Sequence, residues 1–179
     1  PATLPIFALE AGFYAHRPLW SLVLSGAFDR HPSLKLVLAE AGSAWVATTL
    51  AAMDNVQAKQ EEGAIGVMTI SDPLHLELKP SEYWQRNCWL GSSFMTRGDA
   101  EDRDAVGVDR IMWGSDFPHE EGTFPYTAES LAHTFAGIDP GEVARMIGLT
   151  AAGVYEFDLD VLRPVADRIG PSVGSVFAG

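Results

Sequence analysis

The sequence predicts an α/β fold built from parallel strand–helix units, because short apolar runs alternate along the chain with longer segments of helical periodicity. A second observation is that two carboxylates, Glu40 and Asp116, each follow an apolar run at the point where a strand is expected to end. In parallel sheets and α/β barrels the carboxyl ends of the strands carry the ligand site. With 179 residues, 47% of them hydrophobic, the chain suits a single domain over residues 1–179.

Residues 17–62 are predicted to form a helix, a strand and a second helix. Apolar residues recur near the helical period over 17–31, where Pro18 suits the first turn of a helix. The run "LKLVLAE" over 34–40 has the apolar character of a buried parallel strand. The longest helical pattern of the chain follows over 43–62, with Ser43 as its expected N-cap.

The rest of the chain continues this alternation after a surface loop expected over 63–80, which is marked by glycine and proline. Asp139 followed by Pro140 is typical of the start of a helix. The elements predicted here are a helical turn over 81–87, a strand over 88–94, an acidic helix over 97–107, a strand over 110–116, helices near 126–136 and 140–147, and a last helix over 158–170.

Charge and cysteine content exclude several classes of partner. The chain has 24 acidic and 12 basic residues and a formal net charge of −12, so its surface repels phosphate backbones and we expect no nucleic-acid partner. Its apolar runs fall short of the ~20 residues that a membrane span needs, so we expect no membrane partner. Cys88 is the only cysteine and cannot form an intrachain disulfide. We therefore expect a reducing, cytoplasmic location, with Cys88 as a small core residue.

Asp116, in the stretch "RIMWGSDFPHEEGTFP" over 110–125, is the first candidate site residue. A carboxylate at a strand end can bind a divalent metal, act as an acid or base, or cap the following turn. His119 follows three residues later, so both side chains can converge on a metal or a water, or His119 can be an ordinary loop histidine. Glu40 is the second candidate, because a buried glutamate needs a partner or a metal. A capping or ion-paired role stays open for it.

Three separate blocks of the sequence resemble the amidohydrolase-related family, which groups around aminocarboxymuconate-semialdehyde decarboxylase and metal-dependent hydrolases. The blocks are "GAFDRHPSLKLVLAEAGSAWV" over 26–46, "KPSEYWQRN" over 79–87 and "VDRIMWGSDFPHEEGTFP" over 108–125. The resemblance covers roughly residues 17–170. It implies the C-terminal part of a (β/α)8 TIM-type barrel, about three to four βα units, with the upstream half outside this chain. The start at Pro1, without a methionine, agrees with a fragment or a processed product.

The resemblance also implies a divalent-metal site at the carboxyl ends of the barrel strands, with Asp116 as the metal ligand from the eighth strand. The expected metal is Zn²⁺, with Mn²⁺ as the alternative. The family's His-x-His does not occur in this sequence and its fifth-strand histidine has no clear candidate here, so the remaining ligands are expected outside this chain. Glu40 stands where the family commonly has a histidine after the sixth strand, and Thr150 stands where it usually has an asparagine.

The activity implied by the resemblance is hydrolysis of a small organic substrate through a metal-activated water. Asp116 would bind the metal and accept a proton, His119 would fix Asp116 or meet a substrate carboxylate, and Glu40 would face the substrate or transfer a proton. Non-oxidative decarboxylation of an unsaturated or aromatic acid on the same metal platform is the alternative. A third reading is a catalytically silent half-barrel or interaction subunit. The expected partners are a small-molecule substrate, the upstream half of the barrel or a partner chain, and further copies in a homo-oligomer.

Overall fold

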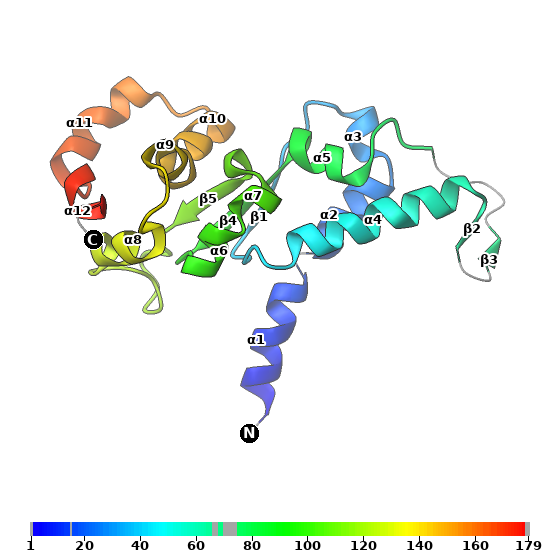
Figure 1. Ribbon diagram of the computed structural model, residues 1–179, viewed down its shortest axis with the longest axis horizontal. Coiled ribbons are helices and arrows are strands. Elements are labelled where there is room, and N and C mark those ends of the chain that lie inside the picture. The colour runs from blue at the N-terminus through cyan, green and yellow to red at the C-terminus, as the bar shows by residue number, and fades with distance from the viewer. Residues whose placement is uncertain (1, 15, 66–67, 70–74, 178–179) are drawn as a thin grey trace. The chain divides into compact units, whose positions relative to one another are not determined.

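The computed structural model describes residues 2–14, 16–65, 68–69 and 75–177. The chain divides into two compact units, residues 1–89 and residues 90–179, and Figure 1 labels the elements of both. The prediction of a single domain over 1–179 stays a prediction.

The first unit consists mainly of helices, with three short strands in its described part. Its helices are α1 (Thr3–Tyr14), α2 (His16–Leu24), α3 (Ala27–Arg30), α4 (Val46–Glu61) and α5 (Pro80–Asn87). Its strands are β1 (Leu36–Ala39) and the two-residue β2 (Ala64–Ile65) and β3 (Met68–Thr69), which pair antiparallel. β2 and β3 lie inside the segment expected to be a surface loop, part of which (66–67 and 70–74) falls outside the described residues. The core side chains, all under a tenth exposed, are Leu19, Val23, Phe28, Leu38, Val46, Leu50, Met53, Tyr83 and Trp84.

The helix predicted over 17–31 is interrupted, and Gly26 is the cause. α2 ends at Leu24, Gly26 adopts a left-handed backbone with φ of 69°, and α3 begins at Ala27. A left-handed residue cannot continue a right-handed helix, and glycine adopts this conformation at no steric cost. The turn is closed by the guanidinium of Arg30, whose Nη1 donates to the Ser25 carbonyl at 2.8 Å.

The prediction that Ser43 caps the long helix is wrong. α4 begins at Val46, and Trp45 stands at the N-cap position. Ser43 is buried and its carbonyl accepts the Val46 N–H at 3.0 Å, so the chain makes one further turn before the helix begins. The apolar residues of α4 that face the core, not a polar cap, therefore set its start.

The second unit contains two parallel strands and short helices. Its strands are β4 (Cys88–Ser93), which begins at the end of the first unit, and β5 (Ile111–Gly114). Its helical segments are α6 (Arg97–Glu101), α7 (Arg103–Val106), η1 (Val108–Arg110), α8 (Thr127–Phe135), α9 (Pro140–Ala144), η2 (Arg145–Leu149), α10 (Thr150–Tyr155), α11 (Leu159–Ile169) and α12 (Val173–Phe177).

β4 and β5 form the parallel pair that positions the candidate site. Leu90 pairs with Ile111 and Ser93 with Gly114, so both strands end at the same edge. Strand residues 88–90 and 111–112 are under a tenth exposed, and Cys88 is fully buried as expected. The prediction of an α/β fold with parallel strands is confirmed by this pairing and by the helices that follow each strand.

Several helix boundaries of the second unit follow the sequence closely. Asp139 caps α9, because its Oδ1 accepts the N–H groups of Gly141 at 2.9 Å and Glu142 at 3.1 Å. Asp158 caps α11 in the same way, with bonds to the two residues that follow Leu159. These aspartates satisfy N–H groups that a helix start leaves without partners, as the sequence predicts for Asp139.

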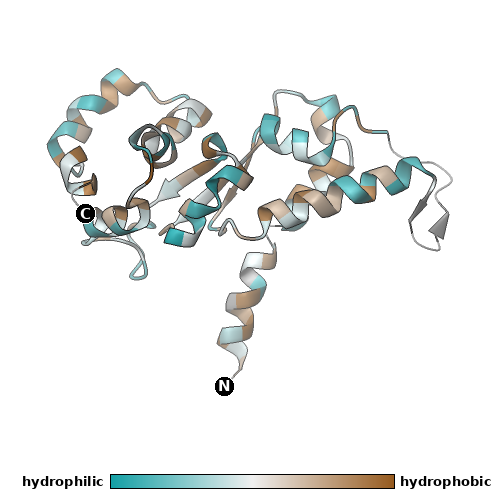
Figure 2. Ribbon diagram, in the orientation of Figure 1, coloured by the Kyte–Doolittle hydropathy of each residue, from teal (hydrophilic) through white to brown (hydrophobic). Residues whose placement is uncertain are grey.

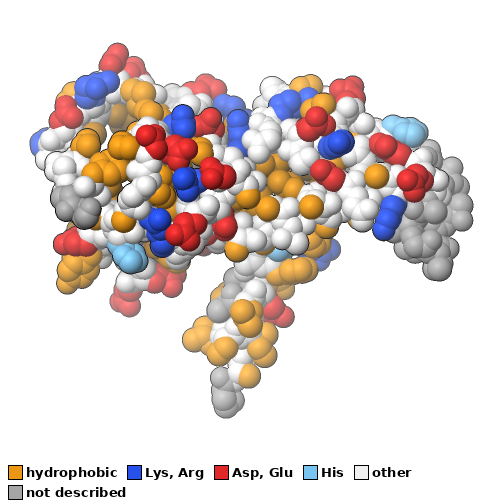
Figure 3. Space-filling model, viewed as in Figure 1, with side chains coloured by type: hydrophobic (Ala, Val, Ile, Leu, Met, Phe, Trp, Pro, Cys, Tyr) orange, Lys and Arg blue, Asp and Glu red, His pale blue; other side chains and the backbone are white. Residues whose placement is uncertain are grey.

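α1 exposes several large apolar side chains. Leu4 and Leu9 are 75% and 80% exposed, and apolar side chains occur along most of the helix (Figures 2 and 3). At 12 residues it is too short to cross a bilayer, which takes about 20 residues. None of the helices in the described part of the chain combines the length and the apolar character of a membrane span.

Candidate metal centre

The loop that follows β5 carries the candidate site, and it begins with a reversal of the backbone at Asp116. β5 ends at Gly114, and Asp116 adopts a left-handed conformation with φ of 59°. Aspartate is one of the few residues other than glycine that adopts this conformation readily. The reversal places the Asp116 carboxylate just beyond the carboxyl end of a buried parallel strand, where the sequence predicts it.

Backbone hydrogen bonds close the loop into a compact unit over residues 115–123. The N–H of Thr123 donates to the Ser115 carbonyl at 2.9 Å and ties the two ends of the loop together. Within it, the His119 N–H donates to the Asp116 carbonyl at 2.9 Å, and the Gly122 N–H donates to the His119 carbonyl at 3.1 Å. The polar side chains of this loop therefore project from a backbone with defined turns.

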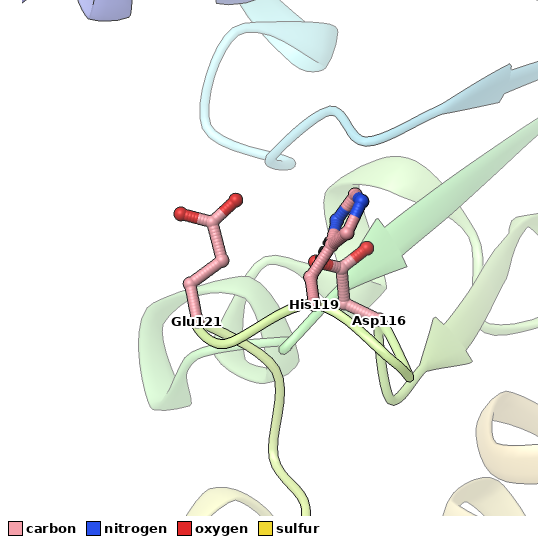
Figure 4. A group of neighbouring side chains, drawn as sticks. All are labelled: Asp116, His119 and Glu121. Atoms are coloured by element: carbon pink, nitrogen blue, oxygen red, sulfur yellow. Dashed lines mark hydrogen bonds and ion pairs between the residues drawn. The ribbon is translucent and has the colours of Figure 1, made fainter.

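Asp116 and His119 form a direct side-chain pair. Nδ1 of His119 lies 2.9 Å from Oδ2 of Asp116, and Figure 4 shows the imidazole against the carboxylate. The Asp116 side chain is 9% exposed, whereas that of His119 is 62% exposed. The histidine thus covers a nearly buried carboxylate and fixes the orientation of one of its oxygens, as a group does that orients a metal ligand or a general base.

Glu121 completes a three-residue cluster that the sequence reasoning missed. Ligand atoms of Asp116, His119 and Glu121 all lie within 4.8 Å of one another. The Glu121 side chain extends from the same loop as His119 (Figure 4), and His119, Glu120 and Glu121 line an open depression. Carboxylate oxygen and imidazole nitrogen are the donors that Zn²⁺ and Mn²⁺ accept, so these residues fit a divalent metal. The spacing of a histidine and a glutamate in "HEE" was the available sequence signal.

Glu40 lies in the first unit, whereas the cluster around Asp116 lies in the second. It follows β1 directly, is exposed, and has a left-handed backbone with φ of 55°. Phe94, directly after β4, is also left-handed, with φ of 40°. Each of the strands β1, β4 and β5 is thus followed within two residues by a non-glycine residue with a left-handed backbone. This conformation is uncommon for residues other than glycine and often accompanies functional sites.

Comparison with known proteins relates the segment that carries the cluster to one protein family. Residues 99–157 match the protein-family model described as amidohydrolase, and this segment contains β5 and the whole cluster of Asp116, His119 and Glu121. No curated protein matches the sequence. The match confirms the resemblance recognised in the sequence: residues 99–157 are similar to the amidohydrolase family.

Several solved structures are similar to this chain in fold. The 5-carboxyvanillate decarboxylase of Sphingomonas paucimobilis is 23% identical, with a TM-score of 0.60 over 76% of this chain and 38% of its own. A dihydroxybenzoic acid decarboxylase of Polaromonas sp. JS666, with bound manganese and 2-nitroresorcinol, is 21% identical, with a TM-score of 0.59 over 86% and 41%. An amidohydrolase of Mycobacterium avium subsp. paratuberculosis K-10 is 25% identical, with a TM-score of 0.60 over 78% and 32%. The chain thus spans about two fifths or less of the length of these structures.

Proposed function

We propose that this chain supplies Asp116 as one ligand of a divalent-metal site in a metal-dependent enzyme of the amidohydrolase family. The observation that carries the proposal is the nearly buried Asp116 carboxylate, held by His119 at the end of a parallel strand with a second carboxylate in reach. The complete site would belong to a (β/α)8 barrel in which β1, β4 and β5 with their helices form three units. Other ligands of the metal would come from outside this chain.

The reaction we favour is the non-oxidative decarboxylation of a small aromatic acid. Two of the similar structures are decarboxylases of substituted benzoic acids, and one of them holds manganese. Hydrolysis, the reaction that the sequence puts first, is the second candidate, and the similar structure from Mycobacterium avium, an amidohydrolase, supports it. Both reactions can use a divalent cation beside the bond that breaks. A divalent metal polarises a bound oxygen or lowers the pKa of a bound water.

The residues of this chain have separable roles in that reaction. Asp116 would hold the metal with one carboxylate oxygen, while the other accepts from Nδ1 of His119. The imidazole thereby restricts the rotation of the carboxylate, and Glu121 adds a second anionic oxygen that favours a cation. Loss of CO₂ breaks a carbon–carbon bond and leaves a carbon that must gain a proton. A carboxyl group facing the substrate can deliver that proton, and Glu40 is the candidate for this role.

The experiment uses the full-length protein, stripped of metal and reloaded with Zn²⁺ or Mn²⁺. Release of CO₂ from hydroxybenzoic acids and hydrolysis of amides and lactones are measured side by side. We expect Asp116→Asn to abolish the metal-dependent rate, because an amide is a far weaker ligand than a carboxylate. Glu120→Gln is the matched control, since it neutralises an exposed acidic residue of the same loop outside the cluster. An Asp116→Asn variant with undiminished turnover would contradict the proposal.

A further inference from the structure

Gly122 lies where the loop over residues 115–123 has no room for a side chain. A Cβ atom built on Gly122 would lie 2.7 Å from the Ser115 carbonyl oxygen and 3.1 Å from the carbonyl oxygens of Asp116 and His119. Real Cβ atoms essentially never approach another atom within 3.0 Å. All three oxygens belong to the backbone, so no rotation of a side chain can relieve the contact.

The same three carbonyl groups hold the loop together. The Ser115 carbonyl accepts from Thr123, the Asp116 carbonyl from His119 and the His119 carbonyl from Gly122 itself, at 2.9–3.1 Å. A carbonyl that moves to admit a Cβ atom must lengthen or break at least one of these bonds. Because Asp116 and His119 are carried on the same backbone, such a movement also displaces their side chains.

The requirement for glycine here is steric and not conformational. Among the residues that the structure describes, the glycines with positive φ are Gly26, Gly63, Gly107 and Gly137, and Gly122 is not one of them. An alanine at position 122 could therefore adopt the same backbone conformation, but its Cβ atom would collide with the carbonyl oxygens named above. Gly170 offers a useful comparison, because its Cβ would lie 2.7 Å from the Ala166 carbonyl at the end of α11, far along the chain from the cluster.

We propose that Gly122 is a positioning residue of the metal centre: its missing side chain allows the loop to close and so brings the donor atoms of Asp116, His119 and Glu121 together. The closure itself follows from the contacts of Gly122, and only its consequence for metal rests on the proposed function. Because the Cβ atom alone already collides, Gly122→Ala should disturb the loop almost as much as Gly122→Ser. If side-chain bulk were the cause, the disturbance would instead grow with the size of the side chain.

The test compares Gly122→Ala with Gly170→Ala and Gly153→Ala in the full-length protein. Gly170→Ala introduces a similar collision elsewhere, and Gly153 has nothing within 4 Å of its Cβ position. The first readout is amide hydrogen exchange at His119, residue 122 and Thr123, which we expect to rise at least about tenfold in Gly122→Ala alone. The second is Co²⁺ binding, with a dissociation constant raised by about 10- to 100-fold and an altered visible spectrum, as for lost support of a metal ligand.

The two readouts separate this inference from the proposed function. Unchanged amide exchange in Gly122→Ala overturns the positioning role, whether or not the protein binds metal. Raised exchange supports it even if the wild-type protein binds no metal at Asp116, in which case the proposed function fails alone. A Gly170→Ala variant that loses Co²⁺ affinity as much as Gly122→Ala would also overturn it, because the loss would then reflect general destabilisation.

Discussion

The stability of the first unit should fall at high pH because of one buried hydroxyl, that of Tyr83 on α5. This side chain is fully buried, and its hydroxyl donates to the Asp29 carboxylate of α3 and accepts the Leu78 N–H at 3.2 Å. The other Asp29 oxygen accepts the Glu77 N–H at 3.3 Å. Ionisation of Tyr83 would bury a phenolate beside a carboxylate, so the network is stable only with the hydroxyl protonated.

Burial, followed by the hydrogen bond to Asp29 and the repulsion by its charge, raises the pKa of Tyr83 from 10.0 to about 12. The protonated form is therefore favoured by the folded state. The resulting stability is complete below pH 10, where the unfolded chain is protonated as well, and it is lost as the pH rises through about 12. Each pKa unit corresponds to about 1.4 kcal/mol, so the stability at stake is on the order of 2–3 kcal/mol.

Urea unfolding of wild type and Tyr83→Phe between pH 8 and 11.5 measures this contribution. At pH 8 we expect Tyr83→Phe to cost about 1–3 kcal/mol, because Asp29 and the Leu78 N–H lose a partner. Above pH 10 the difference between the two proteins should shrink as the wild type loses its own contribution. Tyr126→Phe, at a residue 69% exposed, is the control and should leave the curve unchanged. The reasoning is refuted if Tyr83→Phe keeps the full pH dependence of the wild type above pH 10.

Two further predictions concern single residues. Asn87 is 2% exposed, and its amide nitrogen donates to the carbonyls of Pro32 and Leu34. Asn87→Ala should therefore lower the free energy of unfolding in urea by about 2–4 kcal/mol, and a loss below about 1 kcal/mol would contradict this. Gly137 has a left-handed backbone with φ of 70°, so Gly137→Ala should lower the free energy of unfolding by about 1 kcal/mol, and an unchanged melting temperature would oppose the argument.

The sequence predicted the elements of this fold better than their ends. The strands expected over 34–40, 88–94 and 110–116 are present, each within three residues of its expected limits, because apolar runs between turn signals define strands well. α1 and α12 were not expected, and the break at Gly26 was underestimated. A glycine inside a helical pattern is tolerated or not according to the packing around it, which a local pattern does not contain.

The candidate site was also predictable only in part, because some of its contacts form only in the folded loop. Asp116 and His119 were found because a strand end and a spacing of three residues are visible in a sequence. Glu121 was missed because its carboxylate comes near the pair only through the turn after Asp116. The role of Gly122 depends on carbonyl groups from three other residues, whose meeting is a property of the closed loop. Whether Glu40 takes part in the site stays a prediction.

Metal binding by the full-length protein tests the central claim most directly. Metal-free wild type, Asp116→Asn and Glu120→Gln would each be titrated with Mn²⁺ and Zn²⁺ in a calorimeter, and the bound metal counted after gel filtration. The account predicts about one tightly bound ion in the wild type and in Glu120→Gln, and an affinity at least about 100-fold weaker in Asp116→Asn. Equal metal content and equal affinity in all three proteins would contradict it.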